Sequence, residues 1–437
     1  MGELIPTFFV LCIGAVAAAS WARRFTTREQ QLIMASLGAH ALAACAQVWI
    51  TRDYYGIGDM LLYHETGVEL ARLIRFDPGR FLPEVASLLY HERPYLPVFV
   101  LGAGGSSGVP SAVAGLLATV LNDSLYASCM ALSFATFFSK GGLYLVLRDA
   151  LPEEARVRVL IACFLAPSVV FWSSGILKET IAMVGFGWFV FGWYRFLRGK
   201  PVSGLMIVAL SSLPIAIVKP YILFALFLGA AVWWYWERAL SASGGRAVVI
   251  RPVYLALGSA LALGGILAVG ELFPRYALDN LGEEASRLQA IGSMQAGGSD
   301  YQIADAPARS LLGQMAFAPL ALATSLFRPL IFEVRNAPML LNAVESTVLT
   351  YLFVATVLRR SWDAVWREVR SSPALMFSLT FVLVFGVAVG LASTNMGTLS
   401  RYRIPLVPLF GAFVLVLSRA RAGAPEITPS SSPARLT

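Results

Sequence analysis

Long apolar segments dominate this sequence and limit its fold more than any other feature. A helix crosses the hydrocarbon core of a bilayer in about 20 apolar residues, and a scan with a window of about 19 residues finds eleven such segments. They are residues 4–22, 32–51, 124–147, 157–177, 179–197, 202–218, 220–236, 252–273, 338–358, 374–393 and 403–419. We therefore predict an all-α fold, a polytopic transmembrane helical bundle with about eleven spans.

The composition agrees with this prediction. Hydrophobic residues make up 57% of the chain and charged residues 14%, whereas soluble domains carry roughly 25% charged residues. A soluble enzyme is therefore excluded. The four cysteines lie in apolar segments, and the three histidines lack the spacing of a metal-binding helix, so we predict no metal ion held by protein ligands.

Basic residues are concentrated in every second loop. Groups of Arg and Lys follow the first, third, fifth, seventh, ninth and eleventh apolar segments, beginning with Arg23 and Arg24 and ending with Arg419 and Arg421. Short loops rich in Arg and Lys remain in the cytoplasm. The pattern predicts an N-terminus outside and a C-terminus in the cytoplasm, and it assigns most of the net charge of +8 to membrane orientation rather than to nucleic acid.

Two long segments then fall on the outer side, residues 52–123 and 274–337. Residues 60–76 have the two faces of an amphipathic helix lying in the membrane interface, and residues 109–121 are apolar but too short to cross. Residues 311–331 are apolar but interrupted by two prolines and an arginine, so we expect them to dip into the membrane and return. We predict one transmembrane domain, residues 1–421, and a disordered cytoplasmic tail, residues 422–437.

Several charged residues lie at the outer ends of the predicted spans, where cations are disfavoured. A charge in or near lipid costs several kcal/mol unless it is paired or solvated. The predicted topology brings six of them to one membrane face: Asp59, Lys178, Lys219, Arg328, Arg401 and Arg403. Local alternatives exist, because Asp59 is also placed as a helix N-cap and Lys178 as a lysine that reaches the interface. Lys140, inside the third segment, is expected to reach the cytoplasmic interface in the same way.

A carboxylate beside several cations at a bilayer surface suits a substrate with a phosphate and a lipid tail. Arginine pairs bidentately with phosphate and lysine supplies a compact charge. We expect Asp59 to act as general base and Lys178, Lys219, Arg328, Arg401 and Arg403 to bind phosphate. The side chains expected to bind the rest of the substrate are Tyr54, Tyr55, Tyr63, His64, Trp172, Glu179 and Tyr402. The glycine-rich residues 102–108 lack the lysine of a nucleotide-binding loop and are expected to form a flexible turn.

Three short segments carry a resemblance to a known family: GIGDMLLYHETG (56–67), FWSSGILKE (171–179) and SRYRIPLVPLF (400–410). With the order of the spans, they resemble the C-type glycosyltransferase (GT-C) superfamily and bacterial polysaccharide-polymerase-like membrane proteins. The resemblance implies that the acidic residue in the first long external loop, here Asp59, is the catalytic base. Many members carry a paired Asp-Glu or Asp-Asp in this loop and a C-terminal soluble domain. This sequence departs from that pattern in both respects, which leaves Asp53, Glu65 and Glu92 as alternative bases.

The resemblance implies a glycosyltransferase of the bacterial inner membrane that acts at the periplasmic face. It would transfer sugar from a polyprenyl-(pyro)phosphate donor to an envelope glycan or a lipid-linked acceptor in exopolysaccharide assembly. Its partners would be this donor, the acceptor, membrane lipid and other polysaccharide-assembly proteins, without nucleic acid. No cofactor is expected, and any divalent metal would be held mainly by the donor phosphate.

Two alternatives remain open. A polymerase or ligase would join whole lipid-linked repeat units at the same site. A transporter or flippase of lipid-linked sugars would use the same cations, but transporters favour charges near the bilayer midplane and internal repeats. Here the charges lie at the ends of the apolar segments and no repeat is visible, which favours an enzyme.

Overall fold

The structure is a computed structural model that describes residues 2–241, 246–273 and 311–419, and between the last two ranges residues 280, 282, 283, 286 and 287. The described residues form an all-helical molecule without strands, which confirms the predicted fold class. The predicted tail, residues 422–437, and most of residues 274–310 lie outside the described residues.

Seven helices among the described residues are long and apolar enough to cross a membrane. They are α1 (Leu4–Ala22), α2 (Thr27–Trp49), α6 (Leu125–Ala150), α9 (Lys178–Leu197), α12 (Arg246–Leu272), α16 (Ala337–Arg359) and α18 (Pro373–Ala392). An eighth span is obtained if α19 (Met396–Tyr402) and α20 (Leu406–Leu417), which meet at an angle of 75°, are taken as one broken helix. The chain is therefore a multi-pass membrane protein by the length and composition of its helices.

The remaining predicted spans are helical, but their helices are not both long and apolar enough to cross a membrane. The predicted count of about eleven spans is therefore not confirmed. Residues 157–177 form two short helices, α7 (Arg156–Phe164) and α8 (Pro167–Trp172), because Pro167 begins a new helix. Residues 202–218 form α10 (Pro201–Ala216), with 16 residues, and residues 220–236 lie in α11 (Tyr221–Ser241).

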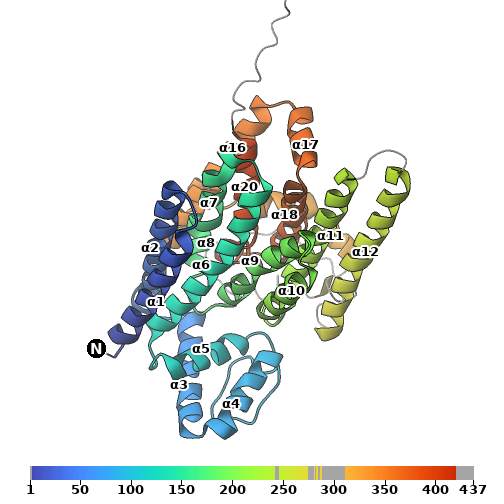
Figure 1. The fold of residues 1–437 in the computed structure, drawn as a ribbon. Coiled ribbons are helices and arrows are strands. Elements are labelled where there is room, and N and C mark those ends of the chain that lie inside the picture. The colour runs from blue at the N-terminus through green and yellow to red at the C-terminus, as the bar shows by residue number, and fades with distance from the viewer. Residues whose placement is uncertain are drawn as a thin grey trace, which may run out of the picture.

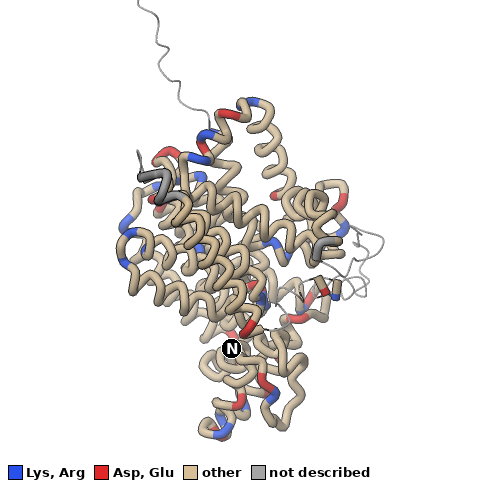
Figure 2. Tube along the Cα trace, turned by 90° about the vertical axis from the view of Figure 1, so that its right-hand side faces the viewer, with Lys and Arg blue, Asp and Glu red and all other residues tan. Residues whose placement is uncertain are grey.

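The bundle has two distinct ends. Figure 1 shows α3 (Asp59–Phe76), α4 (Pro78–Ser87) and α5 (Val109–Val120) below one end, on the side of the N-terminus, and α17 (Trp362–Ser371) at the opposite end. In the side view of Figure 2, charged residues lie mostly at helix ends and in the α3–α5 unit, while long stretches of the bundle carry none. The short helical turns η1 (Ile50–Tyr55), η2 (Leu88–Tyr90), η3 (Glu153–Ala155) and η6 (Ile331–Glu333) connect these helices.

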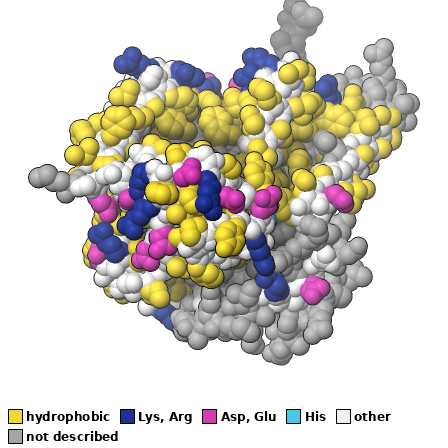
Figure 3. All heavy atoms as spheres, turned by 90° about the horizontal axis from the view of Figure 1, so that it is seen from below, with side chains coloured by type: hydrophobic (Ala, Val, Ile, Leu, Met, Phe, Trp, Pro, Cys, Tyr) yellow, Lys and Arg dark blue, Asp and Glu magenta, His cyan; other side chains and the backbone are white. Residues whose placement is uncertain are grey.

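The amphipathic helix predicted at residues 60–76 is α3, but protein covers much of its apolar side. Leu70 and Ile74 are buried in a small core with residues of α4 and α5. A Cβ atom added at Gly67 would lie 2.5 Å from the Cβ of Ala114 in α5, so the two helices approach closely. The predicted short apolar segment 109–121 corresponds to α5. The surface of this end carries acidic and basic side chains intermixed (Figure 3).

The segment predicted to dip into the membrane, residues 311–331, contains α14 (Leu311–Met315) and α15 (Ala318–Phe327). A Cβ atom added at Gly390 of α18 would lie 2.1 Å from the backbone oxygen of Ala321. Because only glycine permits this approach, α15 packs directly against a predicted span.

Lys140 corrects an expectation. Its side chain does not extend to the cytoplasmic interface, since the residue is 1% exposed and its Nζ atom bonds inside the bundle to His40 and Ser173. In the last turn of the same helix, Arg148 instead pairs with Glu29 at 2.8 Å. Glu29 also completes the capping box of Thr26 that begins α2.

Candidate functional site

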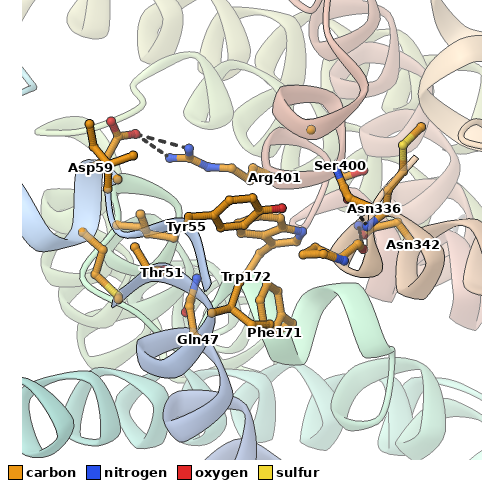
Figure 4. A pocket seen from close by; sticks show the side chains of 18 residues that line it. Gln47, Thr51, Tyr55, Asp59, Phe171, Trp172, Asn336, Asn342, Ser400 and Arg401 are labelled. Carbon is orange, nitrogen blue, oxygen red and sulfur yellow. Dashed lines mark hydrogen bonds and ion pairs between the residues drawn. The ribbon is translucent and has the colours of Figure 1, made fainter. Parts of the chain in front are cut away.

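A cavity of about 210 Å³ lies where η1, α3, α8, α16 and α19 meet (Figure 4). This is many times the roughly 10–15 Å³ that one water molecule needs. Its polar and aromatic lining includes Gln47, Thr51, Tyr55, Asp59, Phe171, Trp172, Asn336, Asn342, Ser400 and Arg401. The residues come from four separate parts of the sequence, 47–60, 171–177, 336–342 and 397–401, so only the folded chain forms this site.

Asp59 is positioned by the glycine-rich turn before α3. Gly56 adopts a left-handed backbone with φ of 68°, and a Cβ atom at Gly58 would lie 2.8 Å from the Thr51 side chain. Gly58 occupies the N-cap position, so Asp59 is the first helical residue rather than the cap. Its carboxylate accepts hydrogen bonds from Nη1 and Nη2 of Arg401 at 3.2 and 3.3 Å.

Four charged groups of alternating sign form a continuous chain from this cavity. Arg401 also pairs with Glu179, with 3.4 Å between Nη2 and Oε2, and Lys219 pairs with Glu179, with 2.9 Å between Nζ and Oε1. Glu179 and Lys219 are 3% and 5% exposed. Together with Asp59, the buried Glu179 carboxylate balances the charges of the two cations. The Asp59–Arg401–Glu179–Lys219 chain thus joins α3, α19, α9 and the α10–α11 connection.

Aromatic rings and burial adjust the electrostatics of this chain. The Nζ atom of Lys219 lies 3.4 Å from the ring centroid of Tyr402, and the guanidinium of Arg401 lies 5.7 Å from that of Trp172. Burial lowers the pKa of Lys219 to about 8, although the Glu179 carboxylate acts in the opposite direction. Burial raises the pKa of the Tyr63 phenol well above its usual range, and the nearby Asp59 charge adds to this effect.

Lys178 lies close to this chain but outside the cavity lining. Its Nζ atom donates to Oγ of Ser107 at 2.8 Å and lies 3.5 Å from Oγ of Ser106. Both serines belong to the glycine-rich segment 102–108, in which Gly102 and Gly104 have positive φ. This predicted flexible turn therefore has a definite contact in the structure, and it connects α9 with the α3–α5 unit.

Arg403 and Arg328 are directed elsewhere. Arg403 is 1% exposed and donates to Oγ of Ser346 at 2.7 Å and to the backbone oxygen of Arg328 at 2.6 Å, with Glu345 at 3.7 Å. Arg328 forms an ion pair with Glu333. The structure thus gives both predicted phosphate ligands protein partners on α15, η6 and α16, and neither lines the cavity.

The predicted substrate-binding residues also divide. Tyr55 lines the cavity. The ring of Tyr54 packs edge-on against the ring of Tyr55, with centroids 4.9 Å apart, and Tyr54 remains exposed. Glu179 is part of the Asp59–Arg401–Glu179–Lys219 chain, and the ring of Tyr402 lies against Lys219 of that chain. His64 instead interacts with the backbone of Asp123, and its neutral form is favoured because burial lowers its pKa.

Among the four carboxylates considered as the base, Asp59 is the one that lines the cavity. Asp53 pairs with its neighbour Arg52 at 3.2 Å. Glu65 and Glu92 are exposed.

Sequence reasoning missed three polar residues of the cavity, Gln47, Asn342 and Ser400. Each has a buried side-chain oxygen without a hydrogen-bond partner among the described residues. The buried Nε1 atom of Trp172 also lacks such a partner. A buried polar atom without a partner costs about 1–3 kcal/mol, so a cluster of them marks a place where a ligand or water completes the bonding. A polar side chain inside an apolar segment is the available sequence signal, and Gln47 in residues 32–51 carries it.

The described residues contain no group of three or more His, Cys, Asp or Glu side chains able to hold a metal ion. Comparison with family models, with curated proteins and with solved structures finds no significant match to this chain.

Proposed function

We propose that this protein is a membrane glycosyltransferase that uses a polyprenyl-(pyro)phosphate-linked sugar donor at the periplasmic face of a bacterial inner membrane. The supporting observation is the cavity in which the Asp59 carboxylate meets Arg401 beside aromatic rings and unpaired polar atoms. The acceptor is an envelope glycan or a lipid-linked glycan in polysaccharide assembly.

The lining supports a polyhydroxylated substrate. The side-chain oxygens of Gln47 and Asn342 accept hydrogen bonds, Nε1 of Trp172 donates one, and the Ser400 hydroxyl does either. Tyr55 and Trp172 offer apolar ring faces beside these groups (Figure 4). Sugars present hydroxyl groups around a ring with apolar C–H faces, and this combination matches them.

In the proposed reaction, Asp59 removes the proton of an acceptor hydroxyl whose oxygen attacks the anomeric carbon of the donor. The bond between that carbon and the phosphate oxygen breaks, and the polyprenyl (pyro)phosphate leaves with its electron pair. Arg401, which pairs with Asp59 before the reaction, stabilises the departing phosphate. Lys178, which carries no carboxylate partner within ion-pair distance among the described residues, supplies a second cation for the phosphate.

The test is glycosyl transfer from lipid-linked donors by purified protein in which Asp59 is replaced by Asn. Loss of a general base lowers the rate about 10²–10⁴-fold, so Asp59→Asn should lose turnover and retain donor binding. Asp53→Asn is the matched control, because its carboxylate lies outside the cavity lining, and it should keep wild-type turnover. Full activity of Asp59→Asn would reject Asp59 as the base. Product size separates transfer of one sugar from joining of whole repeat units.

One observation favours the alternative of a transporter for lipid-linked sugars. Two interrupted helices, α7–α8 and α19–α20, both contribute residues to the cavity, and broken helices surround the binding sites of many transporters. Movement of a sugar lipid across vesicles without a new glycosidic bond would establish transport, and a new bond would establish the enzyme.

A further inference from the structure

A second polar cluster lies in the bundle, away from the cavity lining. The Nζ atom of Lys140 on α6 lies 2.8 Å from Nε2 of His40 on α2 and donates to Oγ of Ser173 at 2.8 Å, just beyond α8. Lys140 is 1% exposed, and His40 and Ser173 are fully buried. Ionisable groups inside membrane segments are costly and therefore indicate a function, and the proposed glycosyl transfer does not use these.

The hydrogen bonds determine where the protons lie. Nδ1 of His40 is 2.8 Å from the backbone oxygen of Ser36, and a carbonyl oxygen only accepts, so Nδ1 carries a proton. Nε2 of His40 then accepts from Lys140 when the imidazole is neutral. The hydroxyl of Ser173 donates to the backbone oxygen of Val169, which leaves its oxygen free to accept from Lys140.

Lys140 thus has two acceptors in fixed positions, and a neutral amine has two N–H bonds that satisfy both. An ammonium group would have a third N–H bond, for which the described residues offer no acceptor. Both protonation states of the Lys140–His40 pair therefore keep the same two bonds. The difference between them is one proton, held by a pair of nitrogens 2.8 Å apart.

No carboxylate of the described residues forms an ion pair with Lys140. The titratable groups around the pair are Cys163 on α7 and Tyr144 on α6. Tyr144 follows Lys140 by about one helical turn, and its phenol donates a hydrogen bond to Glu29. From α2 and the residues after α8, the neighbouring polar groups are the uncharged Ser36, Ser173 and Ser174. Among the described residues, these neighbours include no carboxylate that would stabilise a permanent positive charge on Lys140 or His40.

Polar side chains also lie between the pair and the cavity, without forming a continuous hydrogen-bonded chain among the described residues. Ser133 on α6 bonds to the backbone oxygen of His40 at 3.1 Å and to Ser174 at 2.8 Å. A Cβ atom at the next residue, Gly175, would lie 2.5 Å from Oε1 of Gln47. Gln47 lines the cavity and its oxygen is the unpaired one described above.

We infer that Lys140, His40 and Ser173 form an intramembrane proton-binding site, which takes up and releases one proton by exchange with water on the side of the bundle where the cavity lined by Gln47 lies. This inference is independent of the proposed glycosyl transfer, since it concerns proton exchange alone. The proton moves between water in the cavity and the Lys140–His40 pair, and no other bond forms or breaks.

The test is ¹⁵N NMR of histidine side chains in the full-length protein in lipid vesicles, from pH 5 to 9. The sequence has three histidines, and His40→Gln identifies the signal of His40. We expect this signal to show the Nδ1-protonated form when neutral and to change with pH in one step. Because a neighbouring charge within about 4–6 Å shifts such a step by about one unit or more, its midpoint should differ by at least that much in Lys140→Met.

Cys163→Ala is the matched control and should leave the midpoint unchanged. If Lys140→Met does not fold, Lys140→Gln, which keeps a donor, replaces it. In sealed vesicles with one protein orientation, the His40 signal should follow the pH of the compartment that faces α3–α5. A His40 signal that is constant across the pH range, an unchanged midpoint in both lysine variants, or a response only to the opposite compartment would overturn the inference.

Discussion

At the scale of single residues, Glu179 organises the candidate site. Its carboxylate is almost fully buried and lies between Lys219 and Arg401. Arg401 in turn reaches Asp59 at the cavity. Two of the expected phosphate-binding cations are therefore compensated by carboxylates before any ligand binds. Under the proposed function, a donor phosphate would compete with Asp59 and Glu179 for Arg401, and its binding would release the Asp59 carboxylate.

Replacing Glu179 by Gln should destabilise the protein strongly. The substitution preserves the size of the side chain but leaves two cations without their shared carboxylate, and breaking a buried ion pair costs about 3–5 kcal/mol. Thermal unfolding in detergent measures the effect. Glu65→Gln, at an exposed position of α3, is the control and should unfold like the wild type.

The double variant Glu179→Gln with Lys219→Met sharpens this prediction. Removing the second charge should restore part of the lost stability, because the two residues interact directly and their effects are not additive. Equal unfolding temperatures for Glu179→Gln and the wild type would contradict the central role of this carboxylate.

At the scale of secondary-structure elements, close packing of α9 on α6 supports both polar clusters. A Cβ atom at Gly187 of α9 would lie 1.8 Å from the backbone oxygen of Ser139 on α6. The backbone N–H of Gly187 also donates to Oγ of Ser139 at 2.9 Å. Helix α6 carries Lys140 next to this contact, and α9 begins with Lys178 and Glu179. The contact therefore sets the distance between the helices that hold the two sites.

Gly187→Ala should lower the stability by at least the 1–3 kcal/mol typical of overpacking. The added methyl group meets backbone rather than a movable side chain, so the helices must separate. Gly38→Ala in α2 is the control, because a Cβ atom there meets nothing within 4 Å, and it should unfold at or above the wild-type temperature. Comparison of the two unfolding temperatures checks the prediction, and equal values would show that α6 and α9 are less tightly packed.

At the scale of the whole molecule, the two ends of the bundle differ in their charges and connections. The α3–α5 unit and the cavity lie toward one end (Figure 1). Toward the other end, Glu368 of α17 pairs with Arg360 and Arg419, each at 2.7 Å. The arginine-rich loops predicted to be cytoplasmic thus form ion pairs that hold α17 and the end of α20 together.

The charge pattern predicts which end of the bundle faces outside, and cysteine labelling in intact cells tests this prediction. In a variant without the four native cysteines, Glu92→Cys should react with a membrane-impermeant reagent added outside. Asp363→Cys, also exposed but on α17, should react only after permeabilisation. The reverse result would place the cavity in the cytoplasm and exclude a periplasmic reaction.

The sequence alone determined the all-helical membrane fold and the segments that form its long helices, because apolar length and charge alternation are local properties that the bilayer imposes. It also selected Asp59, Glu179, Lys219 and Arg401, since charges at the ends of apolar segments are visible without a structure. The number of spans was less accessible, because Pro167 divides one segment into two short helices and a broken segment keeps its hydropathy.

Only the tertiary structure decided how these charges pair. It joined Asp59 to Arg401, although the two are 342 residues apart, and gave Arg403 and Arg328 partners elsewhere. It also moved Lys140 from an expected interface position to a buried pair with His40. The physical reason is that charge compensation depends on distances between side chains of different helices, which arise only when those helices pack.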